Sequence, residues 1–159
     1  MLLAFSPAAV RAQAPDSVMV LEAWSGKILQ ASNAGVKRPV ASLTKIATGA
    51  IAVDWAYATQ HDLATTQITV PQSVLQLSGP NPMRLQPGDR LSLRDALYSA
   101  LLGSDNLAAQ TVADHVGRDM LARRGREGDP VEAFVAEMNK LAHALEMDST
   151  RFINPHGLE

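Results

Sequence analysis

The sequence predicts an α+β fold in which an N-terminal β-hairpin precedes a mostly helical body. Two observations lead to this prediction: β-branched residues lie at strand spacing on both sides of a Ser25-Gly26 turn, and later segments carry apolar residues at helical spacing after capping residues. The 159 residues suffice for one domain or for part of a larger one. Because a two-stranded hairpin is only marginally stable alone, we expect this one to need partners from outside the chain.

The first elements along the chain are a hairpin over residues 17–33 and a helix that begins at Ser42. Ser42 directly precedes an apolar helical pattern, so we expect its hydroxyl to cap the N-terminus of a helix that runs to about Thr59. A short strand-like segment follows at residues 67–70. Residues 78–90 are dense in Gly and Pro, which indicates a loop.

The centre of the chain predicts two consecutive helices. Ser92 and Asp95 form a capping pair for the first of them, which carries an apolar stripe and ends at Gly103. The second helix covers about residues 106–115. We expect it to close at Gly117, because glycine is the usual residue just after a helix.

The last third of the chain combines a polar segment with one further helix. Residues 118–130 indicate an exposed loop or a frayed helix, and the arginines at 123–126 favour a solvated face over a phosphate contact. Asp129 signals the start of a helix, because a proline and an acidic residue follow it and an apolar stripe extends to Leu145. Residues 149–159 are expected to form a short strand-like piece and a turn.

Composition and charge exclude several classes of function. The chain is 47% hydrophobic with a net charge of −2, which is typical of a globular protein and argues against general nucleic-acid binding. The absence of cysteine from the sequence excludes a thiol nucleophile, a thiolate metal site and a disulfide. The four histidines are scattered and no H-E-x-x-H motif occurs, so we expect neither a metal nor another cofactor.

The first fourteen residues are similar to a targeting segment. A short apolar run leads to Ala12-Gln13-Ala14, which matches an A-x-A cleavage site, although no positively charged region precedes it. We therefore expect residues 1–14 to be a signal-peptide remnant and the protein to be periplasmic or otherwise extracytoplasmic. A frayed apolar N-terminus is the alternative. No apolar run approaches the ~20 residues that a membrane-spanning helix requires.

A lysine stands at an unusual position in the helix that begins at Ser42. A capping box would place Glu or Gln three residues later, but the chain has Lys45 there, where the helix dipole disfavours a cation. At this spacing the two side chains share one helix face, so a neutral lysine could take the proton of the serine hydroxyl. Lowering a lysine pKa from about 10.4 to about 7 costs ~4.6 kcal/mol, which requires burial. The chemistry therefore predicts that Lys45 is buried.

A second motif, Ser104-Asp105-Asn106, lies at the start of the helix that follows Gly103. The S-x-x-K spacing alone is a weak signal, but S-D-N is much rarer by composition, and their joint occurrence argues against coincidence. Ser104 is either a second N-cap or a second hydroxyl that projects into a cleft together with the carboxamide of Asn106.

These motifs, together with Asn154-Pro155-His156-Gly157-Leu158, resemble those of the serine D-alanyl-D-alanine carboxypeptidases, the low-molecular-weight penicillin-binding proteins. The likeness covers about residues 17–158 and keeps the family's order of motifs. It implies a β-lactamase/transpeptidase-like fold, in which residues 15–159 form an incomplete catalytic domain and residues of about 60–150 form its helical lobe.

The resemblance also implies a role for each motif residue. Ser42 would be the acylated nucleophile and Lys45 its base. Ser104 would relay a proton toward the leaving group, and Asn106 would position the substrate and the lysine. Asp105 stands where the family more often has Gly, which weakens nothing essential because S-D-N is usual in β-lactamases and many penicillin-binding proteins.

The third motif is implied to be a loop that borders the site. Its members Asn154, His156 and Gly157 are expected to shape this loop, and His156 is expected to be a structural turn residue rather than a general base, because serine–lysine chemistry needs no imidazole. The implied partners are a peptidoglycan stem peptide that ends in D-Ala-D-Ala and β-lactam antibiotics.

One expected family motif does not occur in the sequence. The family carries K-T-G on a later strand, and none of the four lysines is followed by Thr-Gly. We therefore expect the chain to be the N-terminal portion of a longer protein and to be inactive by itself. The family's membrane-anchoring segment would lie beyond Glu159.

Three alternative functions stay open at this point. A peptidoglycan D,D-endopeptidase shares the same catalytic set. A class A β-lactamase shares two motifs but also carries E-x-x-L-N, and the residues after Glu132, Glu137 and Glu146 do not match it. A non-catalytic peptidoglycan-binding scaffold would keep the fold without the reaction.

Overall fold

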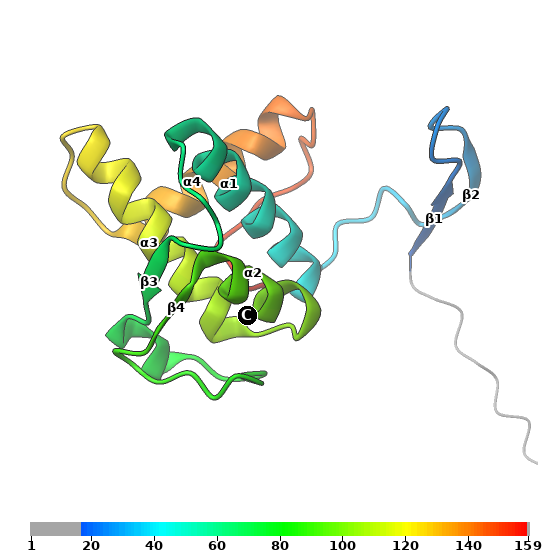
Figure 1. Cartoon of the computed structure of the whole chain (residues 1–159). Helices are drawn as coiled ribbons and strands as arrows, with labels where there is room; N and C mark the ends of the chain where they lie inside the picture. Colours follow the sequence, from blue (N-terminus) through cyan, green and yellow to red (C-terminus); the bar gives the residue numbers. More distant parts are fainter. Residues whose placement is uncertain (1–16, 159) are drawn as a thin grey trace, which may run out of the picture. The chain divides into compact units, whose positions relative to one another are not determined.

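The computed structural model describes residues 17–158 (Figure 1). The chain forms two compact units that divide between Arg38 and Pro39, and each is described separately. The expected signal-peptide remnant at residues 1–14 lies outside the described residues.

The first unit contains an antiparallel hairpin of β1 (Val18–Leu21) and β2 (Ile28–Ser32). The carboxylate of Glu22 organises the turn, because it accepts hydrogen bonds from the backbone N–H and the hydroxyl of Ser25. Gly26 adopts a φ of +69°, a conformation that glycine reaches without strain. The predicted hairpin and its Ser25-Gly26 turn are thereby confirmed, and all of β2 is exposed.

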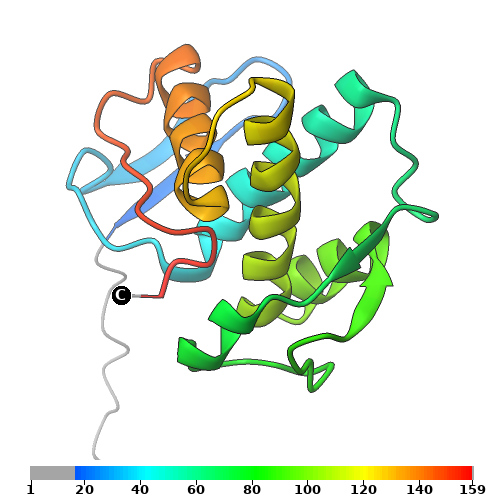
Figure 2. The ribbon, with the colours of Figure 1, turned by 90° about the vertical axis from the view of Figure 1, so that its left-hand side faces the viewer.

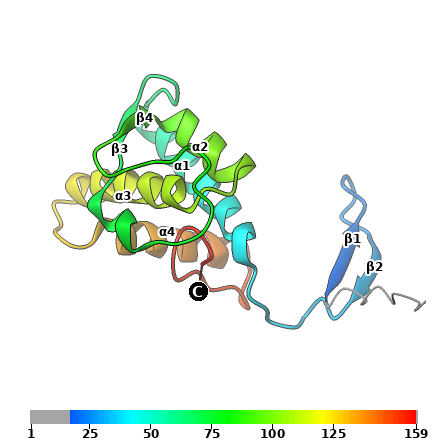
Figure 3. The same ribbon diagram turned by 90° about the horizontal axis from the view of Figure 1, so that it is seen from below.

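The second unit is mostly helical, with four α-helices, two 3₁₀ turns (η1, η2) and one short two-stranded sheet among its described residues. Its elements in chain order are η1 (Ala41–Leu43), α1 (Thr44–Thr59), β3 (Gln67–Thr69), η2 (Gln72–Gln76), β4 (Arg90–Ser92), α2 (Leu93–Leu102), α3 (Asn106–Arg123) and α4 (Pro130–Ala144). The α3 and α4 helices lie side by side (Figures 2 and 3).

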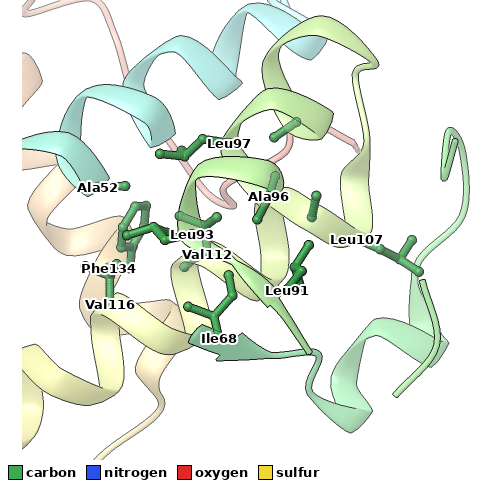
Figure 4. Packing of buried hydrophobic residues seen from close by; sticks show 14 of the residues in the cluster. Ala52, Ile68, Leu91, Leu93, Ala96, Leu97, Leu107, Val112, Val116 and Phe134 are labelled. Atoms are coloured by element: carbon green, nitrogen blue, oxygen red, sulfur yellow. The ribbon is translucent and has the colours of Figure 1, made fainter. Parts of the chain in front are cut away.

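The core of this unit is one cluster of apolar side chains from all four helices and the β3–β4 pair (Figure 4). In that pair Ile68 lies opposite Leu91, and both side chains are buried. Phe134 and Met138 bring α4 into the same cluster. Small and branched residues dominate the remainder: Ile51, Ala52, Ala56, Val70, Val74, Leu85, Leu93, Ala96, Leu97, Ala100, Leu107, Ala108, Ala109, Val112, Ala113 and Val116.

Two of the predicted helix starts are confirmed by their side-chain hydrogen bonds. The Ser92 hydroxyl accepts from the backbone N–H of Asp95 at 3.0 Å, and the Asp129 carboxylate accepts from the N–H of Glu132 at 2.8 Å. Ser92 also ends β4, a strand that the sequence did not predict, because it is three residues long and follows a loop dense in Gly and Pro.

The predicted end of α3 at Gly117 is wrong, because the helix continues to Arg123. Gly117 serves packing instead of capping. A Cβ at this position would lie 1.8 Å from the backbone oxygen of Pro130, so only glycine lets the start of α4 approach α3 this closely. Residues 118–123 of the polar segment, which was expected to be a loop or a frayed helix, are therefore part of α3.

The strand-like piece predicted at the chain end is also wrong, because residues 149–158 contain no strand. The side chain of Asn139 forms the hydrogen bonds to the backbone of this segment that a neighbouring strand would form. Its Oδ1 accepts from the N–H of Phe152 at 2.9 Å, and its Nδ2 donates to the Phe152 carbonyl at 2.9 Å. The terminal segment is thereby attached to α4.

Candidate active site

Three polar side chains from two distant segments meet in the second unit. The hydroxyl oxygens of Ser42 and Ser104 lie 2.6 Å apart, although 62 residues separate them in the chain. The Nζ atom of Lys45 lies 3.3 Å from Ser42 Oγ and 3.5 Å from Ser104 Oγ. The two sequence motifs therefore converge on one site.

Ser42 does not cap the helix, contrary to the prediction. It lies in the 3₁₀ turn η1, and neither η1 nor α1 has a side-chain cap. The preceding residue, Ala41, adopts a φ of +45°, which is uncommon for a residue with a Cβ. The hydroxyl of Ser42 consequently contacts Ser104 and Lys45 instead of the backbone at the helix start.

Ser104 is likewise not an N-cap, so the capping alternative is wrong for both serines. Asp105 caps α3 in its place: its Oδ1 accepts from the N–H of Ala108 at 3.0 Å. Ser104 itself adopts a φ of +55° between α2 and α3. Because its neighbour performs the capping, the hydroxyl of Ser104 is directed to Ser42.

Lys45 is buried, as its proposed chemistry requires, with 2% of its surface exposed. Burial lowers the pKa of Lys45 from its ordinary value, because desolvation penalises the ammonium. The carboxylate of Asp105 opposes this effect and raises the pKa. The third contact of Nζ is the backbone carbonyl oxygen of His156 at 2.8 Å.

The loop at residues 154–158 is attached to α1 through its backbone. Thr48 lies one turn beyond Lys45, and its hydroxyl donates to the Pro155 carbonyl at 2.6 Å. Sequence analysis missed Thr48, although its i, i+3 spacing from Lys45 places it on the same helix face. Gly157 packs against the turn before α1, because a Cβ there would lie 1.9 Å from the backbone oxygen of Ala41.

Side chains of the same loop fix its shape. The Oδ1 atom of Asn154 accepts from the N–H groups of His156 and Gly157, and its Nδ2 donates to the Leu158 carbonyl. Burial, assisted by the charge of Lys45, lowers the pKa of His156 to about 4, so its imidazole is neutral near pH 7. Its Nδ1 accepts from the backbone N–H of Leu158 at 3.1 Å, which is the geometry of a turn residue.

Asn106 lies beside the site but contacts a different segment. Its Nδ2 donates to the backbone carbonyl of Ser78 at 2.8 Å, and its own N–H donates to the carbonyl of Pro80 at 3.0 Å. Within residues 17–158 it makes no hydrogen bond to Lys45. Gly79 permits the close approach, because a Cβ there would lie 2.6 Å from Asn106 Nδ2.

The convergent hydroxyls open into a cavity of about 410 Å³. Its walls combine the three polar side chains with an apolar rim from η1, α1 and α2. The lining residues are Val40, Ser42, Leu43, Lys45, Ile46, Ala100, Leu101 and Ser104. This volume suits a small-molecule or peptide-end ligand.

The arginines near the end of α3 are mostly paired with acidic neighbours. Arg124 bonds Glu137 of α4, and Arg123 bonds Asp119 one turn before it. These ion pairs favour the solvated face that the sequence predicts over a phosphate site.

In the described part of the chain, no cluster of three or more His, Asp or Glu side chains is arranged to hold a metal. Over the same residues, no helix has the length and apolar character needed to cross a bilayer.

Comparison with known proteins decides the family. The D-alanyl-D-alanine carboxypeptidase family, peptidase S11, matches residues 4–159. The chain belongs to this family. The S11 chain is 31% identical over 149 residues to a D-alanyl-D-alanine endopeptidase of Pseudomonas aeruginosa, covering 91% of this chain and 42% of that protein. It is also 31% identical over 146 residues to the D-alanyl-D-alanine carboxypeptidase DacC of Escherichia coli, covering 89% of this chain and 34% of that protein.

The same fold occurs in solved structures of this family. The D-alanyl-D-alanine carboxypeptidase DacD of Francisella tularensis superposes with a TM-score of 0.78 and 27% identity, over 100% of this chain and 35% of that one. The predicted transpeptidase-like α+β fold is thereby confirmed. This S11 chain spans less than half the length of each of these three proteins.

Proposed function

We propose that the protein is a D-alanyl-D-alanine carboxypeptidase that removes the terminal D-alanine from peptidoglycan stem peptides through an acyl-enzyme on Ser42. The observation that carries this proposal is the convergence of the Ser42 and Ser104 hydroxyls on the buried amine of Lys45. Membership of the S11 family supports the choice of substrate. We assign residues 15–159 to part of the catalytic domain.

The contacts of Lys45 indicate how a neutral amine would act as a base. The carbonyl oxygen of His156 can only accept, so one N–H of the lysine is committed to it. A neutral amine has one further N–H and one lone pair for the two hydroxyls. One serine hydroxyl can therefore donate a hydrogen bond to the lone pair of the lysine. The other hydroxyl is linked to the first by the 2.6 Å contact between the two oxygens.

In the proposed acylation, Ser42 Oγ attacks the carbonyl carbon of the penultimate D-alanine as its proton passes to Lys45. The peptide C–N bond then breaks, and the departing amine takes a proton through Ser104. Water next attacks the ester, breaks the bond between Ser42 and the peptide, and restores the hydroxyl. General base catalysis of this kind contributes ~10²–10⁴ in rate.

The remaining roles and partners belong to the same proposal. Asn106 lies at the edge of the site, where it would contact the substrate, while the loop at 154–158 holds Lys45 in place through its backbone. The proposed site of action is the cell wall outside the cytoplasm, and β-lactams, which resemble the acyl donor, are proposed to acylate Ser42. Because the chain spans less than half the length of the relatives that it matches, the tests use the full-length protein.

Labelling with a fluorescent penicillin tests the proposal. A stable adduct that maps to Ser42 by peptide mass spectrometry, is lost in Ser42→Ala, and accompanies D-alanine release from a stem pentapeptide is the expected result. Rapid hydrolysis of the penicillin would contradict the proposal and would indicate a β-lactamase. The absence of any adduct would leave a non-catalytic scaffold.

The endopeptidase alternative has a specific observation in its favour, because the Pseudomonas aeruginosa relative is named for that activity. An endopeptidase would cleave the cross-link between two stem peptides instead of releasing free D-alanine. Purified cross-linked muropeptides and a monomeric pentapeptide, supplied separately to the complete gene product, distinguish the two. We expect the pentapeptide to be the better substrate.

A further inference from the structure

Within residues 17–158, Asp105 is the one buried carboxylate beside the candidate site that the proposed reaction does not use. Its side chain is fully buried among the described residues, whereas Ser104 and Asn106 on either side are assigned to the site. Burying a carboxylate without hydrogen-bond partners costs free energy, so the partners of Asp105 indicate which part of the structure it stabilises.

The contacts of Asp105 cap α3 and join it to α2. Oδ1 accepts from the N–H of Ala108 in the first turn of α3. Oδ2 accepts from the hydroxyl of Ser99 in the last turn of α2 at 2.7 Å, and the Asp105 N–H donates to the Ser99 carbonyl at 3.2 Å. The carboxylate thus fixes the connection that contains Ser104.

That connection holds Ser104 in an uncommon conformation. A φ of +55° is unfavourable for a residue with a Cβ, so the surrounding contacts must hold it. The conformation directs the hydroxyl toward Ser42, at 2.6 Å. Asp105, one residue further on, provides the anchors on both helices.

The same carboxylate supplies a negative charge that acts on Lys45. In the described part of the chain, Asp105 and His156 interact electrostatically with the lysine: Asp105 favours the ammonium, and His156 is neutral near pH 7. Burial favours the free amine and Asp105 opposes it, so the balance between them sets the fraction of lysine that can accept a proton.

We propose that Asp105 is a positioning residue, whose carboxylate holds the Ser104 hydroxyl against Ser42 and supplies the counter-charge of the Lys45 ammonium. This inference rests on the proposed function for its catalytic meaning, but the geometry and the charge of Lys45 are measurable without turnover.

Asp105→Asn separates the charge from the hydrogen bonds. Asparagine is also a good N-cap, and its amide can still bond the Ser99 hydroxyl, so this variant removes chiefly the charge. Asp129→Asn is the matched control, because Asp129 caps α4 in the same way at an exposed position. Asp105→Ala and Asp129→Ala form a second pair, in which the cap is removed as well.

The test measures the titration of the Lys45 Nζ and Cε resonances in the complete gene product with isotope-labelled lysine, where Lys45→Arg assigns the signals. We expect Asp105→Asn to lower the Lys45 midpoint and Asp129→Asn to leave it unchanged. The acid limb of the penicillin-acylation rate should move by the same amount. An unchanged midpoint in folded Asp105→Asn overturns the proposal.

The alanine pair tests the positioning of Ser104. We expect Asp105→Ala to acylate at least tenfold more slowly than Asp129→Ala. Both variants are measured at one temperature, at which both are folded. Equal rates in the two variants would overturn the positioning role. If the wild-type protein forms no penicillin adduct, the proposed function fails, while the lysine titration still decides whether Asp105 controls the charge of Lys45.

Discussion

The Nζ atom of Lys45 lies 2.8 Å from the backbone carbonyl oxygen of His156, which follows it by 111 residues. This contact joins the first helix of the second unit to its terminal loop. It also commits one N–H of the lysine, so the lone pair of a neutral amine is left for the hydroxyls of Ser42 and Ser104. The terminal loop therefore supports the proposed base without contributing a side chain to the reaction.

Replacing Lys45 by methionine tests the requirement for the amine. Methionine has a similar shape and suits a buried site, so we expect the variant to fold, although the His156 carbonyl loses its donor. The rate of acylation by a fluorescent penicillin should fall by ~10²–10⁴, the contribution of a general base. A decrease of less than tenfold, with folding verified by circular dichroism, would remove Lys45 from the mechanism.

Gly157→Ala is expected to damage both stability and the site. A Cβ at this position would lie 1.9 Å from the Ala41 backbone oxygen, and the residue has a φ of +77°. Gly125→Ala is the control, because Gly125 has a φ of +59° with nothing within 4 Å of the added Cβ. The control should cost about 1 kcal/mol from backbone strain alone. Denaturant titration should show a larger loss for Gly157→Ala, and equal losses would contradict the close packing.

Gly117→Ala tests the packing of α3 against the start of α4. The added Cβ would lie 1.8 Å from the Pro130 backbone oxygen, so we expect the free energy of unfolding to fall by about 2 kcal/mol or more. Gly49→Ala, also within a helix, would meet only the flexible end of Leu101 at 3.3 Å. Because alanine favours helix by about 1 kcal/mol, this control should be neutral or stabilising. A tolerated Gly117→Ala would show that the two helices do not approach so closely.

The buried imidazole of His156 predicts that stability decreases in acid. Its pKa is about 4 in the folded chain, whereas an unfolded histidine titrates near 6.5. The neutral form is therefore favoured by folding, and this stabilisation is complete above pH 6.5 and is lost as the pH falls toward 4. The loss contributed by this one group is of order 3 kcal/mol.

His156→Asn should reduce this acid sensitivity, because an asparagine oxygen can accept from the Leu158 N–H without titrating. Unfolding free energies at pH 7 and pH 4.5 measure the effect, with the exposed His143→Asn as the control. We expect the difference between the two pH values to shrink only in His156→Asn. An equal difference in wild type and variant would contradict the burial of a neutral His156.

Local signals predicted the parts of the fold that depend on local contacts. The caps at Ser92 and Asp129 were predictable because the partner of each lies three residues away. The caps expected at Ser42 and Ser104 failed because each hydroxyl has a partner 62 residues away, which a local pattern does not contain. Gly117 was misinterpreted for a similar reason, since its neighbour Pro130 belongs to the next helix.

At the candidate site too, local sequence signals predicted some contacts and missed those between distant segments. The spacing of Ser42 and Lys45 predicts a shared helix face, and the rarity of the S-D-N motif associates Ser104 with them. The contribution of the His156 backbone carbonyl could not be predicted, because a main-chain group leaves no trace in the residue type. The sequence also did not show that Asp105, and not Ser104, caps α3, because both residue types are good N-caps.

The titration of Lys45 in the complete gene product tests the central claim most directly. A lysine whose amine is withdrawn from water beside two hydroxyls should change charge at a pH clearly below the ordinary lysine pKa of 10.5. Isotope-labelled lysine and nuclear magnetic resonance measure this midpoint, and Lys45→Arg identifies the signal. A midpoint at or above 10.5 would leave the lysine an ammonium throughout the physiological range and would contradict its role as the base.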